Sequence, residues 1–111
     1  MLRTQEQEKK ICTSCPMAKT ANLVGDSCTL IIIRDLLVES KRFGDFEASL
    51  TGVSTRTLTK KLTLLVDQGI VKRTKTTTKP SYIEYSLTKK GRGLSKIIKS
   101  MEEYGKQFLT T

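Results

Sequence analysis

The 111-residue sequence contains no histidine and no tryptophan, and proline occurs only twice. The absence of histidine removes the commonest general base and the commonest metal ligand of proteins. A glycine-rich phosphate loop is also missing, and no pair of carboxylates falls where a cleft is expected. These absences argue against an enzyme, and they predict that the protein uses neither a metal nor an organic cofactor.

Long apolar runs are missing as well. No stretch approaches the roughly 20 apolar residues that a membrane-spanning helix needs, and segment 1–10 lacks the apolar core of a signal peptide. Three cysteines are too few for the disulfide framework of a small secreted protein, which agrees with a reducing compartment. We therefore expect a cytoplasmic protein without a membrane partner, folded as a single domain over residues 1–111.

Basic residues outnumber acidic ones, and their distribution is uneven. The chain has 20 lysines and arginines against 11 aspartates and glutamates, which gives a formal net charge of +9. Residues 1–40 are balanced, whereas residues 41–80 carry nine basic and three acidic side chains and residues 81–111 carry six and three. Two thirds of the excess charge thus lies in the middle of the chain. This concentration favours a surface for a polyanion over a generally basic, solvated protein.

The order of apolar patterns predicts a mainly helical (α+β) fold with one small β-hairpin. Capping residues, glycine stops and periodicity predict helices 16–24, 28–38, 43–50, 54–68 and 89–108, and strands 70–74 and 82–87. The apolar run 28–38 could also be a strand. Its length and the cap residues Asp26 and Ser27 favour a buried helix.

Residues 43–68 have the pattern of a helix-turn-helix. A short helix is followed by a turn that contains Gly52 and by a second helix that Ser54 caps. On the second helix three leucines fall on one side, and Arg56 and Lys60 fall roughly opposite. An outward basic face is typical of a recognition helix, which reads base edges in the major groove of DNA. The expected DNA-reading residues are Ser54, Thr55, Arg56, Thr57, Thr59, Lys60 and Lys61.

The hairpin expected over residues 70–87 is also basic, and it directly follows the second helix, as the wing of a winged helix-turn-helix does. Basic side chains on a wing hold phosphates, which fixes a protein on the duplex without reading the base sequence. The expected phosphate contacts are Arg42, Lys72, Arg73, Lys75 and Lys79.

Several short motifs, in this order and spacing, resemble the HxlR-type winged helix-turn-helix regulators of the MarR-like superfamily. They are Cys15-Pro16, Gly25 before the apolar helix, residues 42–46, Gly52-Val53-Ser54, residues 69–73 and residues 85–88 with Gly91. The resemblance covers about residues 15–108 and implies a homodimeric DNA-binding regulator of bacterial or archaeal type, paired mainly through its terminal helices. Two positions depart from the family: Ser27-Cys28 replaces the usual Lys-Trp, which requires repacking of the core, and Leu64 replaces a charged residue.

The last predicted helix indicates how two chains pair. Its apolar face is too large for so short a chain to bury alone, and it consists of Leu94, Ile97, Ile98, Met101, Tyr104 and Phe108. We expect a second copy to cover this stripe, so that two recognition helices meet a short inverted repeat in double-stranded DNA. The function expected is sequence-specific transcriptional regulation. A basic RNA- or ribosome-associated module with the same fold is the alternative, although such a module would not need a two-fold axis.

Cys12 and Cys15 form a C-x-x-C motif. A structural zinc site would need four ligands, whereas only Cys28 remains, and a thioredoxin-like enzyme would need a βαβ context. Cys15 precedes Pro16 at a predicted helix start, where the helix dipole and Lys19 favour the thiolate. In the family that the chain resembles, this cysteine is an oxidation sensor in some members. One hypothesis is therefore a thiol sensor at Cys15 that Cys12 resolves, and the other is a small buried hydrophobic residue. Cys28 is expected in the core.

Overall fold

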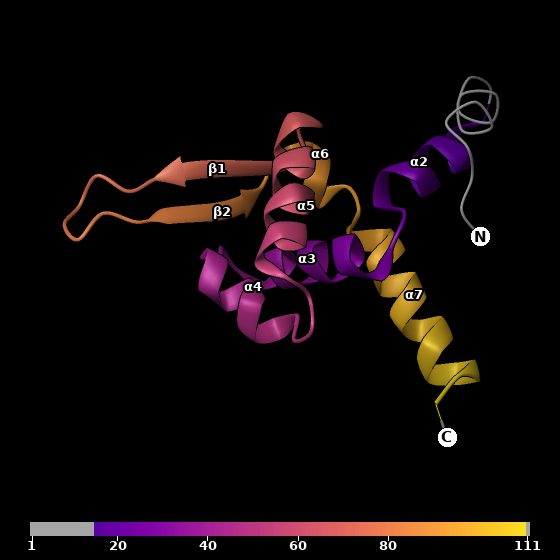
Figure 1. The fold of residues 1–111 in the computed structure, drawn as a ribbon. Helices are drawn as coiled ribbons and strands as arrows, with labels where there is room; N and C mark the ends of the chain where they lie inside the picture. The colour runs from indigo at the N-terminus through magenta and orange to yellow at the C-terminus, as the bar shows by residue number, and fades with distance from the viewer. Residues whose placement is uncertain (1–14, 111) are drawn as a thin grey trace.

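The fold consists of packed helices with one projecting β-hairpin (Figure 1). The computed structural model describes residues 15–110. In chain order the elements are α2 (Pro16–Val24), α3 (Ser27–Val38), α4 (Phe43–Ser49), α5 (Thr55–Asp67), β1 (Val71–Lys75), β2 (Ile83–Leu87), α6 (Lys89–Arg92) and α7 (Ser95–Phe108). This order confirms the mainly α fold with one hairpin. Figure 1 shows the hairpin on one side of the molecule and α2 and α7 on the other. Within the described range, no helix is long and apolar enough to cross a bilayer.

The apolar run that could have been a strand is α3, a helix at the centre of the molecule, as predicted. Asp26 caps it, because its carboxylate accepts a hydrogen bond from the Thr29 N–H at 2.8 Å. Ile32 and Ile33 have no exposed surface, and Leu36 is also buried. The apolar residues extend around this helix because α7 and β2 both pack against it.

The predicted helix-turn-helix is formed by α4 and α5. On α4, Phe46 is fully buried, and its ring meets Tyr85 of β2 edge-on with 6.1 Å between the centroids. On α5, the three leucines predicted for the inner face, Leu58, Leu62 and Leu65, are all buried. These apolar contacts fix which face of α5 turns toward solvent.

The hairpin is attached to the helices at its base. Its strands pair antiparallel, and Val71 lies opposite Leu87 at the end nearest the helices. β1 begins one residue later than predicted, because Ile70 is buried in the core and its carbonyl accepts a hydrogen bond from the Thr88 N–H. Two backbone hydrogen bonds, of 3.0 and 2.7 Å, join Lys41 to Tyr85 of β2. The segment before α4 therefore anchors the hairpin.

The continuous C-terminal helix predicted over residues 89–108 is wrong: the structure has two helices, α6 and α7. The reason is a close approach at Gly91, where a side-chain carbon would lie 2.2 Å from the Ile70 carbonyl oxygen. The Thr88 hydroxyl caps α6 by accepting a hydrogen bond from the Gly91 N–H at 3.1 Å. The chain leaves this contact at Gly93, and α7 then runs in a different direction (Figure 1).

The predicted pairing stripe also needs correction, because its residues differ in burial along α7. Leu94 and Ile98 are each 7% exposed and belong to the protomer's own core, where α7 packs on α3. Ile97 is partly buried against the same core. The distal part of α7 is different: Met101, Tyr104 and Phe108 are 51%, 58% and 62% exposed. The described part of the chain leaves these three side chains uncovered.

Candidate DNA-binding surface

The recognition helix α5 begins with a well-formed cap. Ser54 accepts a hydrogen bond from the Thr57 N–H at 3.1 Å, as the sequence predicts. The preceding turn needs Gly52, whose φ of 91° lies in the left-handed region. The first turn of α5 is thus capped by Ser54, and the N-terminal end of the helix carries the partial positive charge of its dipole.

The outer face of α5 is basic. Arg56 and Lys60 are exposed, and they lie away from the buried leucines. Within residues 15–110, no acidic side chain forms an ion pair with any of six exposed basic residues of α5 and the hairpin: Arg56, Lys60, Lys72, Arg73, Lys75 and Lys79. This surface therefore keeps its full positive charge for a polyanion.

Three of the four threonines of α5 use their hydroxyl protons inside the protein. The Thr59 hydroxyl donates to the Thr55 carbonyl at 2.8 Å, and the Thr63 hydroxyl donates to the Thr59 carbonyl at 2.8 Å. The Thr55 hydroxyl donates to Glu47 of α4 at 3.3 Å. The exposed threonines thus offer outward a methyl group and an acceptor oxygen, which suit a thymine methyl or an amino group of adenine or cytosine.

Lys61 differs from the other predicted DNA-reading residues. Its ammonium group forms an ion pair with Asp26, at the start of α3, and its side chain is 28% exposed. Burial raises the pKa of Asp26, but the hydrogen bonds from Lys61 and Thr29 outweigh burial and hold that pKa below its ordinary value. The remaining members of the predicted DNA-contacting set are all exposed. The structure therefore groups Lys61 with the α2–α3 turn rather than with Arg56 and Lys60.

Arg42 makes a cation–π contact with a hairpin residue, and this contact was not predicted from the sequence. The Arg42 guanidinium lies 3.4 Å from the centroid of the Tyr82 ring, just before β2. The Tyr82 N–H in turn donates to the Thr76 hydroxyl at 3.0 Å, across the tip of the hairpin. Arg42 is thus held beside the wing while it stays exposed. A cavity of about 270 Å³ between α5 and the hairpin is lined by Thr59, Thr63 and Arg73, among others.

Of the three cysteines, two lie within the described residues, and Cys12 lies outside them. Cys15 is partly exposed and directly precedes Pro16, the first residue of α2, as predicted. Cys28 was predicted in the core, whereas the structure shows it partly buried and packed against the core. Burial and the nearby charge of Asp26 raise the pKa of the Cys28 thiol, which favours its protonated form. Residues 15–110 contain no cluster of acidic and cysteine side chains suited to a metal ion.

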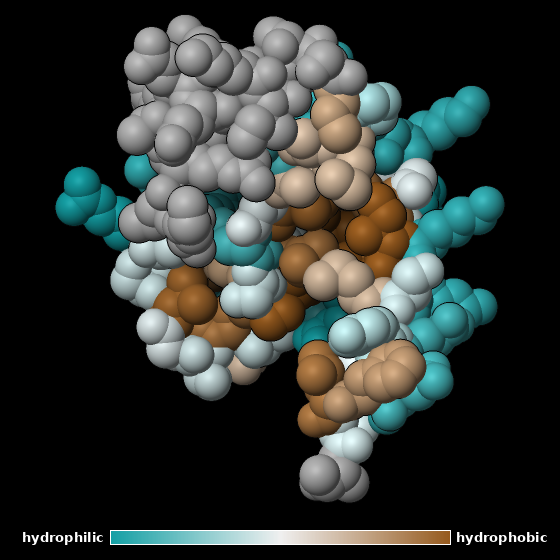
Figure 2. Space-filling view, turned by 90° about the vertical axis from the view of Figure 1, so that its right-hand side faces the viewer, coloured by the Kyte–Doolittle hydropathy of each residue, from teal (hydrophilic) through white to brown (hydrophobic). Residues whose placement is uncertain are grey.

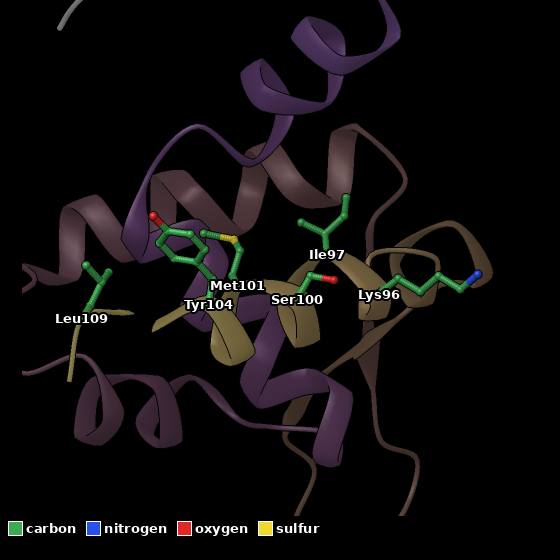
Figure 3. A pocket seen from close by; sticks show the side chains of 6 residues that line it. All are labelled: Lys96, Ile97, Ser100, Met101, Tyr104 and Leu109. Carbon is green, nitrogen blue, oxygen red and sulfur yellow. The ribbon is translucent and has the colours of Figure 1, made fainter. Parts of the chain in front are cut away.

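The second notable surface lies on α7. Figure 2 shows apolar side chains gathered on the side of the molecule that carries α2 and α7. A groove of about 510 Å³ runs along α7, and Figure 3 shows Ile97, Met101 and Tyr104 on one side of that helix. The rings of Tyr104 and Phe108 lie 4.9 Å apart between centroids. A second groove, of about 190 Å³, lies between Met101 and the α3 residues Leu30 and Ile31.

Comparisons with known proteins agree with this architecture. Residues 23–111 match the HxlR-like helix-turn-helix family. The HTH-type transcriptional regulator YvaP of Bacillus subtilis (strain 168) is 33% identical over 96 residues, which cover 86% of this chain and 89% of YvaP. The structure of the redox regulator HypR in its oxidized form superposes with a TM-score of 0.80 at 32% identity, covering 87% of this chain and all of that one. The reduced form of the transcriptional regulator YodB from B. subtilis gives a TM-score of 0.75 at 28% identity, with 87% and 96% covered.

These relatives are transcriptional regulators, and the RNA- or ribosome-associated alternative gains no support from them. The winged helix-turn-helix fold, the family match over four fifths of the chain and the similarity to YvaP agree with one another. The chain therefore belongs to the HxlR-like helix-turn-helix family of DNA-binding transcriptional regulators.

Proposed function

We propose that this protein binds an inverted-repeat operator in double-stranded DNA as a homodimer and regulates transcription from it. One observation carries the proposal: the capped recognition helix presents Arg56 and Lys60 outward beside a basic hairpin, with no ion pair to an acidic residue of segment 15–110. Donors on such a helix reach base edges in the major groove. The hairpin lysines and arginines hold the flanking phosphates.

The two-fold partner in this proposal is a second copy of the chain. The distal α7 side chains Met101, Tyr104 and Phe108 form an exposed apolar surface next to grooves of about 510 and 190 Å³. A symmetric dimer through this surface would cover it and place two recognition helices about 34 Å apart, one turn of DNA. Symmetry of this kind is what an inverted repeat requires.

The experiment is a selection of bound fragments from genomic DNA, followed by affinity measurements on the selected operator and on random DNA. Arg56→Ala should weaken operator binding by about 1–3 kcal/mol and random binding much less, because a base contact is lost. The matched control, Lys72→Ala, should weaken both alike and reduce the salt slope by about 1, because a phosphate contact is lost. Equal losses on both DNAs for Arg56→Ala would refute base reading, and a consensus without two-fold symmetry would refute the dimeric operator.

We further propose that Cys15 makes this binding responsive to oxidation. Its partly exposed position at the start of α2, together with the similarity to HypR and YodB, supports the proposal. A peroxide oxidises the Cys15 thiolate to a sulfenic acid and is itself reduced to hydroxide. A second thiol, that of Cys12 or of the partner subunit, then displaces water to form a disulfide.

The Cys15 proposal is tested by operator affinity before and after mild peroxide. Wild type should lose affinity, because a disulfide near α2 changes how the two subunits are held, and Cys15→Ser should keep its affinity. Mass spectrometry on the same samples reports the oxidation state of Cys15. Full affinity of wild-type protein in which Cys15 is demonstrably oxidised would contradict a switch.

A further inference from the structure

The ion pair between Lys61 and Asp26 joins three elements at one point. Asp26 follows α2 and caps α3, and Lys61 lies in the middle of α5. One carboxylate oxygen of Asp26 accepts the Thr29 N–H, and the other accepts the Lys61 ammonium. Next to this pair is a small cavity of about 110 Å³ that Gly25 and Gln68 also line. Each carboxylate oxygen therefore accepts a hydrogen bond from a different helix.

Lys61 is poorly placed to hold a phosphate. Its side chain is only 28% exposed, whereas Lys60, one position earlier on α5, is exposed. A phosphate that approached Lys61 would also meet the negative charge of Asp26. The lowered pKa of Asp26 keeps that carboxylate ionised at neutral pH, so this repulsion is always present.

Two other contacts hold α5. Leu58, Leu62 and Leu65 pack its inner face against the core and determine which face turns toward solvent, but apolar contacts are non-directional and define the rotation of the helix less narrowly than a hydrogen bond does. The Thr55 hydroxyl donates to Glu47 of α4 at 3.3 Å, at the first turn of α5. The charged hydrogen bond of Lys61, in the middle of α5, restricts the rotation further because its geometry is narrow. The side-chain surface of a helix lies about 5–6 Å from its axis, so a rotation of about 15° moves it by about 1.5 Å. That displacement is enough to break a bidentate contact to a base.

We propose that Asp26 and Lys61 are positioning residues that set the rotation of the recognition helix, and so the operator specificity, without touching DNA. The inference rests on the proposed function, because it concerns how α5 reads an operator. It replaces the sequence-based assignment of Lys61 to the DNA contacts. It also gives Asp26, which the sequence analysis treated as a helix cap, a second role.

The test uses Asp26→Asn, because electrostatics alone and a positioning role predict opposite changes in operator affinity. Asp26→Asn keeps the cap of α3, since asparagine is also a good cap residue, and removes a negative charge near DNA. Electrostatics alone would therefore tighten binding to every DNA. We expect instead that Asp26→Asn weakens binding to a genomic fragment selected by wild type by about three- to tenfold, with random DNA bound at least as tightly as before.

Lys61→Met keeps the apolar stem and should give the same loss of operator affinity, and the double variant should lose no more than either single one. Lys72→Met is the matched control, because Lys72 is an exposed hairpin residue of the predicted phosphate-contacting set. It should weaken binding to operator and random DNA alike. If Lys61 held a phosphate, Lys61→Met would behave like Lys72→Met and Asp26→Asn would not weaken the operator complex. Either result would overturn the proposal.

A measurement without DNA separates this proposal from the proposed function. The pKa of Asp26, followed by NMR of its carboxyl carbon, should rise toward its ordinary value in Lys61→Met. An unchanged pKa would mean that the pair does not form and would overturn the inference. A wild type that binds no DNA fragment, with the Asp26 pKa shifted as expected, would instead refute the proposed function. Circular dichroism confirms that each variant is folded before its affinity is compared.

Discussion

Replacing Tyr104 by aspartate should convert the proposed dimer into monomers without unfolding the protomer. Tyr104 is 58% exposed and does not belong to the hydrophobic core of the protomer. A tyrosine side chain offers roughly 200 Å² of surface, so about 120 Å² is open to a partner. Covering that area is worth about 3 kcal/mol at 25 cal/mol per Å², and two-fold symmetry counts it twice. Aspartate still covers part of this area and neighbouring side chains rearrange, so we expect a net loss of about half the doubled value, about 3 kcal/mol, or about a hundredfold in the dimer Kd.

Sedimentation velocity at micromolar concentrations measures this change directly. Val38→Asp is the matched control, because Val38 is 79% exposed but belongs to the end of α3 and lines neither groove on α7. It should leave the sedimentation coefficient unchanged. Ile98→Asp should behave differently again, by lowering the unfolding temperature, since Ile98 is buried in the protomer. A wild-type monomer, or a Tyr104→Asp variant that stays dimeric, would refute the reasoning.

Two further predictions concern stability. Gly91→Ala should lower the free energy of unfolding by about 2–3 kcal/mol, because the new carbon would meet the Ile70 carbonyl. The control Gly44→Ala should not destabilise the protein, because Gly44 on α4 has open space around it. Equal unfolding temperatures for the two variants would contradict this prediction. Asp26 has a lowered folded pKa, so its contribution to stability is full above its ordinary pKa of about 4 and is lost as pH falls through the folded value. Acid titration of unfolding should therefore show a shallower loss for Asp26→Asn than for wild type, and parallel curves would count against the pair.

The elements that the sequence predicted well are those whose signals are local. α3 and α5 have a cap residue and an apolar face that repeat within a few positions, and the structure places both where expected. The break between α6 and α7 is marked only by Gly91 and Gly93, and no apolar residue lies between Thr88 and Leu94. Glycines alone do not show whether a helix continues or ends. The structural role of Gly91 depends on its packing against the Ile70 carbonyl, 21 positions earlier, which no local pattern reveals.

The candidate site shows the same limit. A helical wheel correctly placed Arg56 and Lys60 on the outer face of α5. It could not show that Lys61, only one position farther on, has a partner in Asp26, because that partner lies 35 positions away in the chain. The contact of Arg42 with Tyr82 was missed for the same reason. Periodicity gives the direction of a side chain, whereas an ion pair depends on which elements the fold brings together.

The central helix α3 connects the two surfaces on which the proposed function depends. α7 packs on it from one side, and Asp26 at its start holds Lys61 of the recognition helix. Perturbations at these two contacts should therefore have different signatures on DNA. Tyr104→Asp removes the fixed spacing between two recognition helices but leaves each α5 correctly rotated, so its affinity for a single half-site should equal that of a wild-type protomer. Asp26→Asn leaves the spacing intact and changes the rotation, so it should lose affinity even for one half-site. Binding to a half-site duplex thus separates the two contributions. Loss of half-site affinity in both variants would show that rotation and spacing are not independent, and full half-site affinity of Asp26→Asn would contradict the proposed role of rotation.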